Sequence, residues 1–243
     1  MADAIFEHPR LARIYDDVDG DRRDLDEYVA IVDALRARSV LDLGCGTGAF
    51  ACLLAGRGVD VTAVDPAAAS LEVARQKPNA ARVRWLLGDA TTLPPLRVDL
   101  ATMTGNVAQV FLADDEWAAT VHATHDALRP GGHLVFETRD PAFEGWRAWN
   151  RVESYQRFDL PRAGPVETWV DVTDVALPFV SFRATFVFGS DGAVLRSSST
   201  LRFRSRAEIA ESLLTAGFSV EDVRDAPDRP GAELVFVARR SDT

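Results

Sequence analysis

The sequence predicts a doubly wound α/β fold, and three features of its first half support that prediction. Short apolar runs alternate with helical segments between residues 39 and 137. Three glycines stand within five positions after the first apolar run, in VLDLGCGTGAF at residues 40–50. An acidic residue lies near the end of each of the first three runs. Alternating strands and helices are typical of a parallel sheet that binds ligands at the carboxyl ends of its strands.

The expected elements of this sheet follow one another in chain order. SVLDLG is a strand of the kind that is buried on both faces, and AFACLLAGRG is a helix that ends at glycine. DVTAVD is the second strand, and the helix AAASLEVARQK after it ends before Pro78. VRWLLGDA and VDLATMTG are the third and fourth strands. A helix that begins at ADDEW and ends at RPGG then leads to the fifth strand, HLVFET.

The chain changes character after Asp140. β-branched and aromatic residues dominate the segments VESYQRF, VETWVDVTDV, FVSFRATFVFG and AVLRSSSTLRFR. In the third of these, the side chains of one face alternate with those of the other, as in a sheet covered on one face. The first set is Phe182, Ala184, Phe186 and Phe188, and the second is Arg183, Thr185 and Val187. We therefore expect an inserted antiparallel β meander. SRAEIAESLLTAGF then begins a helix at the N-cap Ser205, and SVEDVRD and ELVFVARR are expected to close the main sheet as a strand pair.

These segments predict two structural units. Residues 1–140 and 205–243 form the main domain, and residues 141–204 form a β-rich insertion that serves as a substrate lid or as an oligomer contact, for example in a homodimer. Residues 1–35 are expected to be a helical lid on the main domain. Apolar side chains recur there at the spacing of one helix face, at Leu11, Ile14, Tyr15 and Val18.

Composition excludes several classes of function. The net charge of −10 disfavours a nucleic-acid partner, because an acidic surface repels phosphates. No apolar run approaches the roughly 20 residues that a membrane span needs, and the first residues lack the apolar stretch of a signal peptide. The two cysteines and four histidines show no spacing of metal ligands. We therefore expect a reduced, metal-free, cytoplasmic protein.

The glycine-rich segment predicts a ligand that lies close to the backbone. Glycine adopts conformations that other residues avoid, and without a Cβ it allows direct contact with a ligand. The spacing at Gly44, Gly46 and Gly48 is GxGxG, whereas the dinucleotide fingerprint is GxGxxG. Asp42 stands two positions before this loop and suits a ligand with a positive charge better than a pyrophosphate. A tight turn without a ligand is the alternative.

Two further acidic residues follow the next strands. Asp65 ends the second strand, where a carboxylate can accept hydrogen bonds from ribose hydroxyls. Asp89 follows the third strand, where a carboxylate can accept a hydrogen bond from an adenine amino group. Either residue alone is also common in turns. Together with Asp42 they indicate a nucleoside site.

At this point the sequence resembles a known family. VLDLGCGTG, VTAVD, GDA and LRPGGHLVFE are similar, in order and spacing, to the successive motifs of the class I S-adenosylmethionine-dependent methyltransferases. The similarity runs from Val40 to Glu137. It implies a seven-stranded Rossmann-like sheet whose last strand is antiparallel, and S-adenosyl-L-methionine as the cofactor. The position of the β-rich insertion resembles the small-molecule branch, which includes sugar-amine N-methyltransferases.

The resemblance also implies which residues bind the cofactor. It places Asp65 at the ribose, Asp89 and Ala90 at the adenine, and Asp42 with the Gly44–Gly46 backbone near the methionine moiety. It places Thr104, Gly105 and Asn106 beside the methionine and the methyl group. The complete implied set is Tyr15, Asp42, Gly44, Gly46, Asp65, Pro66, Asp89, Ala90, Thr104 and Gly105.

The implied activity is methyl transfer to an N, O or C nucleophile of a small molecule. A sulfonium methyl group is already activated, so no catalytic triad is expected. Tyr15, Asn106 and Arg139 are the candidates for catalysis, and for each a structural role is the alternative. Trp146 and Trp149 either wall an acceptor or belong to the core of the insertion. A non-catalytic, cofactor-binding regulatory module is the second candidate function, and a nicotinamide-dependent oxidoreductase is the third.

Overall fold

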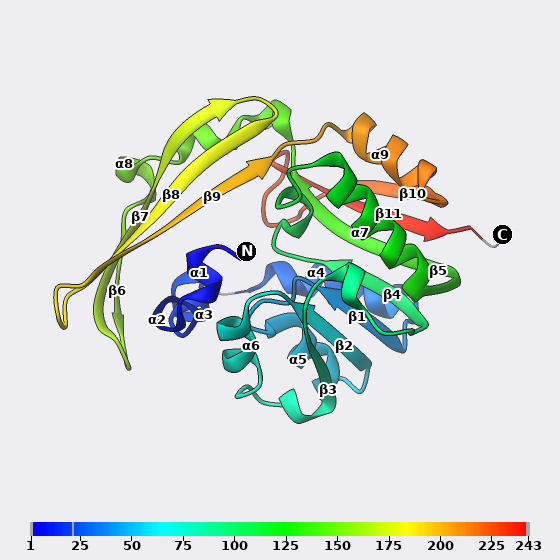
Figure 1. Cartoon of the computed structure of the whole chain (residues 1–243), viewed down its shortest axis with the longest axis horizontal. Coiled ribbons are helices and arrows are strands. Elements are labelled where there is room, and N and C mark those ends of the chain that lie inside the picture. Colours follow the sequence, from blue (N-terminus) through cyan, green and yellow to red (C-terminus); the bar gives the residue numbers. More distant parts are fainter. Residues whose placement is uncertain (1, 21, 242–243) are drawn as a thin grey trace.

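The computed structural model describes residues 2–20 and 22–241 and contains two sheets (Figure 1). The larger sheet has seven strands: β1 (Ser39–Leu43), β2 (Asp60–Asp65), β3 (Val83–Leu87), β4 (Val98–Met103), β5 (Leu128–Arg139), β10 (Phe218–Asp225) and β11 (Glu233–Arg240). The helices and 3-10 turns between them are α4 (Asp24–Ala34), α5 (Ala49–Gly56), α6 (Ala68–Ala74), η1 (Ala80–Arg82), η2 (Ala90–Thr92), η3 (Val107–Gln109), α7 (Asp114–Ala127) and α9 (Arg206–Thr215).

The strand order of the larger sheet confirms the predicted topology. The order is β10-β11-β5-β4-β1-β2-β3, in which β1 to β5 are parallel and β11 is antiparallel to both of its neighbours. β1 pairs with β2 on one side and with β4 on the other, so the direction of winding reverses at this strand. Ligands of such sheets bind in the crevice outside the strand ends at this reversal.

Both faces of the larger sheet are buried, which explains the nearly continuous apolar character of its strands. Leu134 and Phe136 of β5 pack in one cluster with Trp117 of α7, whereas Val135 packs in the other with residues of α4 and α5. The rings of Phe136 and Phe236 stack with centroids 5.3 Å apart. None of the helices in the described part of the chain is long and apolar enough to cross a membrane.

The insertion forms the predicted antiparallel meander. Its elements are η4 (Pro141–Phe143), η5 (Gly145–Ala148), α8 (Arg151–Ser154), β6 (Gln156–Leu160), β7 (Gly164–Ala176), β8 (Phe179–Phe188) and β9 (Val194–Arg202), with strand order β6-β7-β8-β9. Trp146 is buried against Phe203 with ring centroids 4.7 Å apart, and Trp149 packs on Phe182 at 5.0 Å. Both tryptophans therefore belong to the core of the insertion.

The N-terminal segment differs from the single amphipathic helix that the spacing predicts. It is divided into α1 (Ala4–Glu7), α2 (Pro9–Ala12) and α3 (Tyr15–Asp19), and a turn at residues 13–14 separates α2 from α3. Leu11 and Ile14 are buried against Phe186 and Phe188 of the insertion sheet, whereas Tyr15 packs on Phe6. Residues of one predicted helix face thus contact two different surfaces, the insertion sheet and Phe6 of α1. Figure 1 shows this blue segment between the insertion sheet and α6.

Candidate functional site

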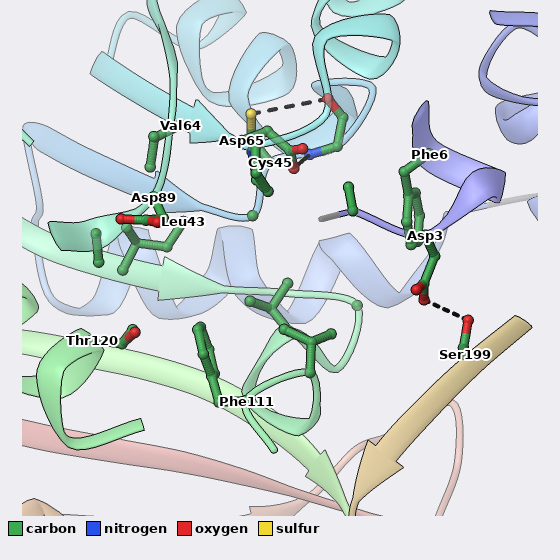
Figure 2. A pocket seen from close by; sticks show the side chains of 18 of the residues that line it. Asp3, Phe6, Leu43, Cys45, Val64, Asp65, Asp89, Phe111, Thr120 and Ser199 are labelled. Atoms are coloured by element: carbon green, nitrogen blue, oxygen red, sulfur yellow. Dashed lines mark hydrogen bonds between the residues drawn. The ribbon is translucent and has the colours of Figure 1, made fainter. Parts of the chain in front are cut away.

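A cavity of about 1050 Å³ opens at the carboxyl ends of β1, β2 and β4. Its walls come from the loops after the first four strands, from the N-terminal segment, from α7 and from the insertion sheet. Sites for small ligands usually measure about 300–1,000 Å³. The cavity therefore lies at the upper end of this range, and Figure 2 shows it from close by.

The three glycines after β1 serve different purposes. Gly46 has a φ of +52° and lines the cavity, and a Cβ on it would enter open space. A Cβ on Gly44 would lie 2.6 Å from Val107 Cγ2, and one on Gly48 would lie 2.5 Å from Trp85 Cη2. Gly44 and Gly48 are thus explained by packing within the protein. Gly46 leaves a space that a ligand can fill.

Asp65 lies at the end of β2 and lines the cavity directly beside this loop. Its two carboxylate oxygens accept hydrogen bonds from the backbone N–H groups of Gly46, at 2.7 Å, and Ala67, at 2.8 Å. Burial raises the pKa of this carboxyl group, and the two N–H groups act in the opposite direction. A carboxylate has about four acceptor positions, so Asp65 can still accept hydrogen bonds from ligand hydroxyls. Pro66 lines the cavity next to it.

Asp89 caps a turn and also lies at the cavity surface. Its side chain accepts hydrogen bonds from the backbone N–H and the hydroxyl of Thr91, at 2.9 and 2.6 Å, and so caps η2. It also lines the cavity together with Ala90, on the side where Thr120 of α7 lies in Figure 2. The turn role is therefore observed, and the adenine role stays a prediction.

Asp42 is not among the residues that line the cavity, and its role in cofactor binding stays a prediction. The side chain is 1 % exposed, and its Oδ1 accepts a hydrogen bond from Thr102 at 3.2 Å. Among the described residues Oδ2 has no hydrogen-bond partner. Burial raises the pKa of Asp42 to about 7. The residue thus lies beneath the glycine loop as a buried carboxyl group with one unused acceptor atom.

Asp42 should make the stability of the protein depend on pH. Its pKa is raised from 3.8 to about 7 on folding, so the folded state binds a proton more tightly than the unfolded chain does. The free energy of unfolding should therefore fall as pH rises from about 4 to about 7, by about 1.4 kcal/mol per pH unit from this residue. Urea denaturation of the wild type and of Asp42→Asn at several pH values measures this contribution as the difference between the two slopes. Equal slopes would contradict it.

The cavity wall carries a residue that sequence reasoning missed. Tyr15 and Arg22 both line the cavity, and Arg22 is the only basic side chain among its described lining residues. Arg22 pairs with Asp24 at 2.8 Å and with Asp19 at 3.3 Å. Nothing in the charged segment DGDRRDLDEY distinguishes this arginine from a solvated one. Burial raises the pKa of Tyr15, so this phenol can donate a hydrogen bond but is a poor general base.

Two catalytic candidates do not lie at the cavity surface. Asn106 is 4 % exposed, and its Nδ2 donates a hydrogen bond to Glu233 Oε1 at 3.0 Å. Arg139 donates to Gln109 Oε1 at 3.0 Å and lies 5.3 Å from the centroid of the Trp149 ring. Neither residue is among those that line the cavity. The roles of these two residues in catalysis stay predictions, whereas Thr104 and Gly105 line the cavity.

The opposite wall of the cavity is rich in hydroxyl groups. Figure 2 shows Asp3 pointing toward Ser199 of β9, whose hydroxyl donates a hydrogen bond to the Asp3 carboxylate. Phe6 lies next to Asp3 in this view, whereas Phe111 lies nearer to Thr120. The residues that the insertion contributes to the wall are Thr173, Ser181, Phe182, Ser198, Ser199 and Thr200. No sequence pattern indicates the contact between residues 3 and 199, because they are 196 positions apart.

The site residues fit an adenosyl ligand. Gly46 and Gly105 each have a positive φ and open space where a Cβ would be, and both line the cavity. Asp65 and Asp89 provide acceptors at two neighbouring strand ends, and Arg22 provides a cation for a carboxylate. The space, the acceptors and the cation lie in one cavity.

Comparison with known proteins agrees with this fit. Residues 40–132 match a family model described as a methyltransferase domain. The biotin biosynthesis bifunctional protein BioHC of Cellvibrio japonicus is 34% identical over 158 residues, which are 60% of this chain and 29% of that protein. The cypemycin N-terminal methyltransferase of a Streptomyces species is 35% identical over 109 residues, 44% of each chain. The chain thus spans less than half the length of these curated relatives.

Solved structures resemble the chain over nearly its whole length. The CcbJ methyltransferase of Streptomyces caelestis has a TM-score of 0.77 at 23% identity, and the match covers 97% of each chain. CalS10 of Micromonospora echinaspora, an amino pentose methyltransferase, has a TM-score of 0.71 at 22% identity, covering 92% of this chain and 94% of that one. Likeness at this identity shows the fold. The chain therefore has the fold of these methyltransferases, and its residues 40–132 match the methyltransferase-domain model.

Proposed function

We propose that this protein transfers a methyl group from S-adenosyl-L-methionine to a nucleophilic atom of a small molecule. The observation that carries the proposal is the cavity, in which the open space at Gly46 lies next to the Asp65 carboxylate at the winding reversal of the sheet. When bound, this cofactor supplies an activated methyl group on a sulfonium. The task of the protein is then to align the acceptor and to exclude water.

The cavity residues suggest a role for each part of the cofactor. Asp65 and Pro66 are placed to hold the ribose, and Asp89 and Ala90 to hold the adenine. Tyr15 donates a hydrogen bond at the methionine end, where the guanidinium of Arg22 suits the carboxylate. Thr104 and Gly105 lie beside the methyl group. Gly44 supports the loop by its packing on Val107.

We infer that the acceptor is an amine that carries hydroxyl groups. Asp3 is the acidic residue at the hydroxyl-rich wall, and its Oδ1 is the carboxylate oxygen that does not receive the Ser199 hydroxyl. A carboxylate favours an ammonium group, and serine and threonine hydroxyls can bind hydroxyl groups. The names of two structural neighbours agree with this inference, since CalS10 acts on an amino pentose and KedS8 is a sugar N-methyltransferase.

Calorimetric titration tests the cofactor, and a labelled methyl group tests the reaction. We expect S-adenosylhomocysteine to bind and NAD not to bind, because GxGxG with Asp42 beneath it does not suit a pyrophosphate. With methyl-labelled cofactor we expect transfer to glucosamine to exceed transfer to glucose or glucuronic acid. Binding of NAD alone would favour the oxidoreductase. Binding of S-adenosylhomocysteine without label transfer to any small molecule of a cell extract would favour the regulatory module.

The remaining proposals concern the setting of this reaction. We propose that residues 1–140 and 205–243 form the cofactor-binding domain, that residues 1–35 are its lid, and that residues 141–204 close over the acceptor or join two copies as a homodimer. The net charge of −10 supports a small-molecule partner over a nucleic acid. No group of metal-ligating side chains occurs in the described ranges, and both cysteines are free there, which fits a reduced cytoplasmic protein.

A further inference from the structure

The loop after β4 has an unusual backbone conformation where it forms the wall of the cavity. Gly105 and Asn106 have φ angles of +74° and +62°, so two successive residues are left-handed. Glycine adopts this conformation freely, and asparagine tolerates it better than most residues with a side chain, so these two residues allow the loop to take this shape. Thr104 and Gly105 line the cavity. Any group that fixes this backbone therefore also fixes the wall beside the proposed methyl group.

Glu137 is the side chain that binds this backbone. It lies near the end of β5 and is 5 % exposed. Its Oε1 accepts hydrogen bonds from the backbone N–H groups of Gly105, at 2.6 Å, and Asn106, at 3.1 Å. Its Oε2 accepts a hydrogen bond from the hydroxyl group of Tyr28, which lies on α4. One carboxylate thus joins two consecutive N–H groups of the loop to a helix that covers the sheet.

Other charged groups surround this contact without binding the loop backbone. Glu233 of β11 accepts hydrogen bonds from Asn106 Nδ2 at 3.0 Å and from Arg229 Nη1 at 2.7 Å. Arg139 Nε lies 3.7 Å from the same carboxylate. Glu233 orients the Asn106 side chain, and the two arginines balance the negative charge of the buried Glu233 carboxylate. These groups leave Glu137 as the acceptor for the two N–H groups.

We propose that Glu137 is a positioning residue, which holds the loop of residues 104–106 in the shape that the cofactor needs. It does not touch the cavity itself, because it is absent from the lining residues, and it acts through the N–H groups of Gly105 and Asn106. The proposal rests on the proposed function, since it concerns the site of the same cofactor.

Five variants separate positioning from stability. Glu137→Gln keeps an oxygen for the two N–H groups, and its amide can donate to the Tyr28 oxygen. Glu137→Ala removes the acceptor. Glu137→Asp moves the carboxylate away from the loop by the length of one methylene group, and this variant is used if the alanine variant does not fold. Tyr28→Phe removes the third donor but leaves the loop contact in place. Leu213→Ala truncates a fully buried side chain of α9 that does not line the cavity, as the control for lost stability.

The readouts are amide hydrogen exchange at Gly105 and Asn106 and calorimetric affinity for S-adenosylhomocysteine, at a temperature where each variant is folded. We expect both amides to lose protection and affinity to fall about tenfold in the alanine or aspartate variant, as for one unmade buried hydrogen bond. The glutamine, phenylalanine and Leu213→Ala variants should retain protection and affinity. Wild-type affinity in Glu137→Ala or Glu137→Asp would overturn the proposal, as would a tenfold loss in Leu213→Ala. Failure of the wild type to bind S-adenosylhomocysteine would instead overturn the proposed function, while amide exchange would still report the loop contact.

Discussion

Gly46→Ala is expected to weaken the binding of S-adenosylhomocysteine by about 10–100-fold, the effect of forcing one extra carbon into a packed contact. The new Cβ would project into the open space of the cavity, where the structure has no protein atom within 4 Å. The fold should tolerate it, because it would clash with no side chain. The substitution therefore tests whether this space belongs to the ligand, and calorimetry measures the change.

Gly58→Ala is the matched control for backbone strain. Gly58 also has a positive φ, of +88°, and a Cβ on it would also meet no atom within 4 Å, but it does not line the cavity. Both variants should lose a similar amount of stability because alanine is disfavoured in the left-handed conformation. Only Gly46→Ala should lose affinity. Equal affinity in the two variants would remove the main support for a ligand at the glycine loop.

The sheet could be predicted from the sequence because its signals are local. A strand that is buried on both faces is apolar throughout, and this pattern identifies β1, β2, β4 and β5 without knowledge of their partners. The glycines and acidic residues at the strand ends then identify the cavity edge, since parallel strands bring their carboxyl ends together. Asp65 and Asp89 line the cavity for this reason.

The rest of the site depends on contacts between distant segments, for which a single sequence carries no signal. The spacing of Leu11, Ile14, Tyr15 and Val18 predicts one helix, but the segment is divided by a turn and two of these side chains pack on the insertion sheet. Asn106 stands at the expected position, yet its left-handed backbone and the acceptor on β11 turn its side chain away from the cavity.

Asp65→Ala is expected to weaken S-adenosylhomocysteine binding by about 10–100-fold, since charge-assisted hydrogen bonds contribute about 1.5–3 kcal/mol each. Two effects act together. The variant loses the acceptor proposed for the ribose hydroxyls. It also leaves the N–H groups of Gly46 and Ala67 without their present partner, so the glycine loop is held less firmly. Calorimetry at a temperature where the variant is folded measures the affinity.

Asp99→Ala separates these effects from a general loss of stability. Asp99 also accepts hydrogen bonds from two backbone N–H groups, those of Arg38 and Ser39, each at 2.9 Å, but it does not line the cavity. Both variants should therefore unfold at lower urea concentrations than the wild type, because backbone N–H groups lose a carboxylate partner. Only Asp65→Ala should also lose affinity. If both variants bound S-adenosylhomocysteine as the wild type does, Asp65 would be a capping residue of the loop, and the ribose would have to be held by other groups.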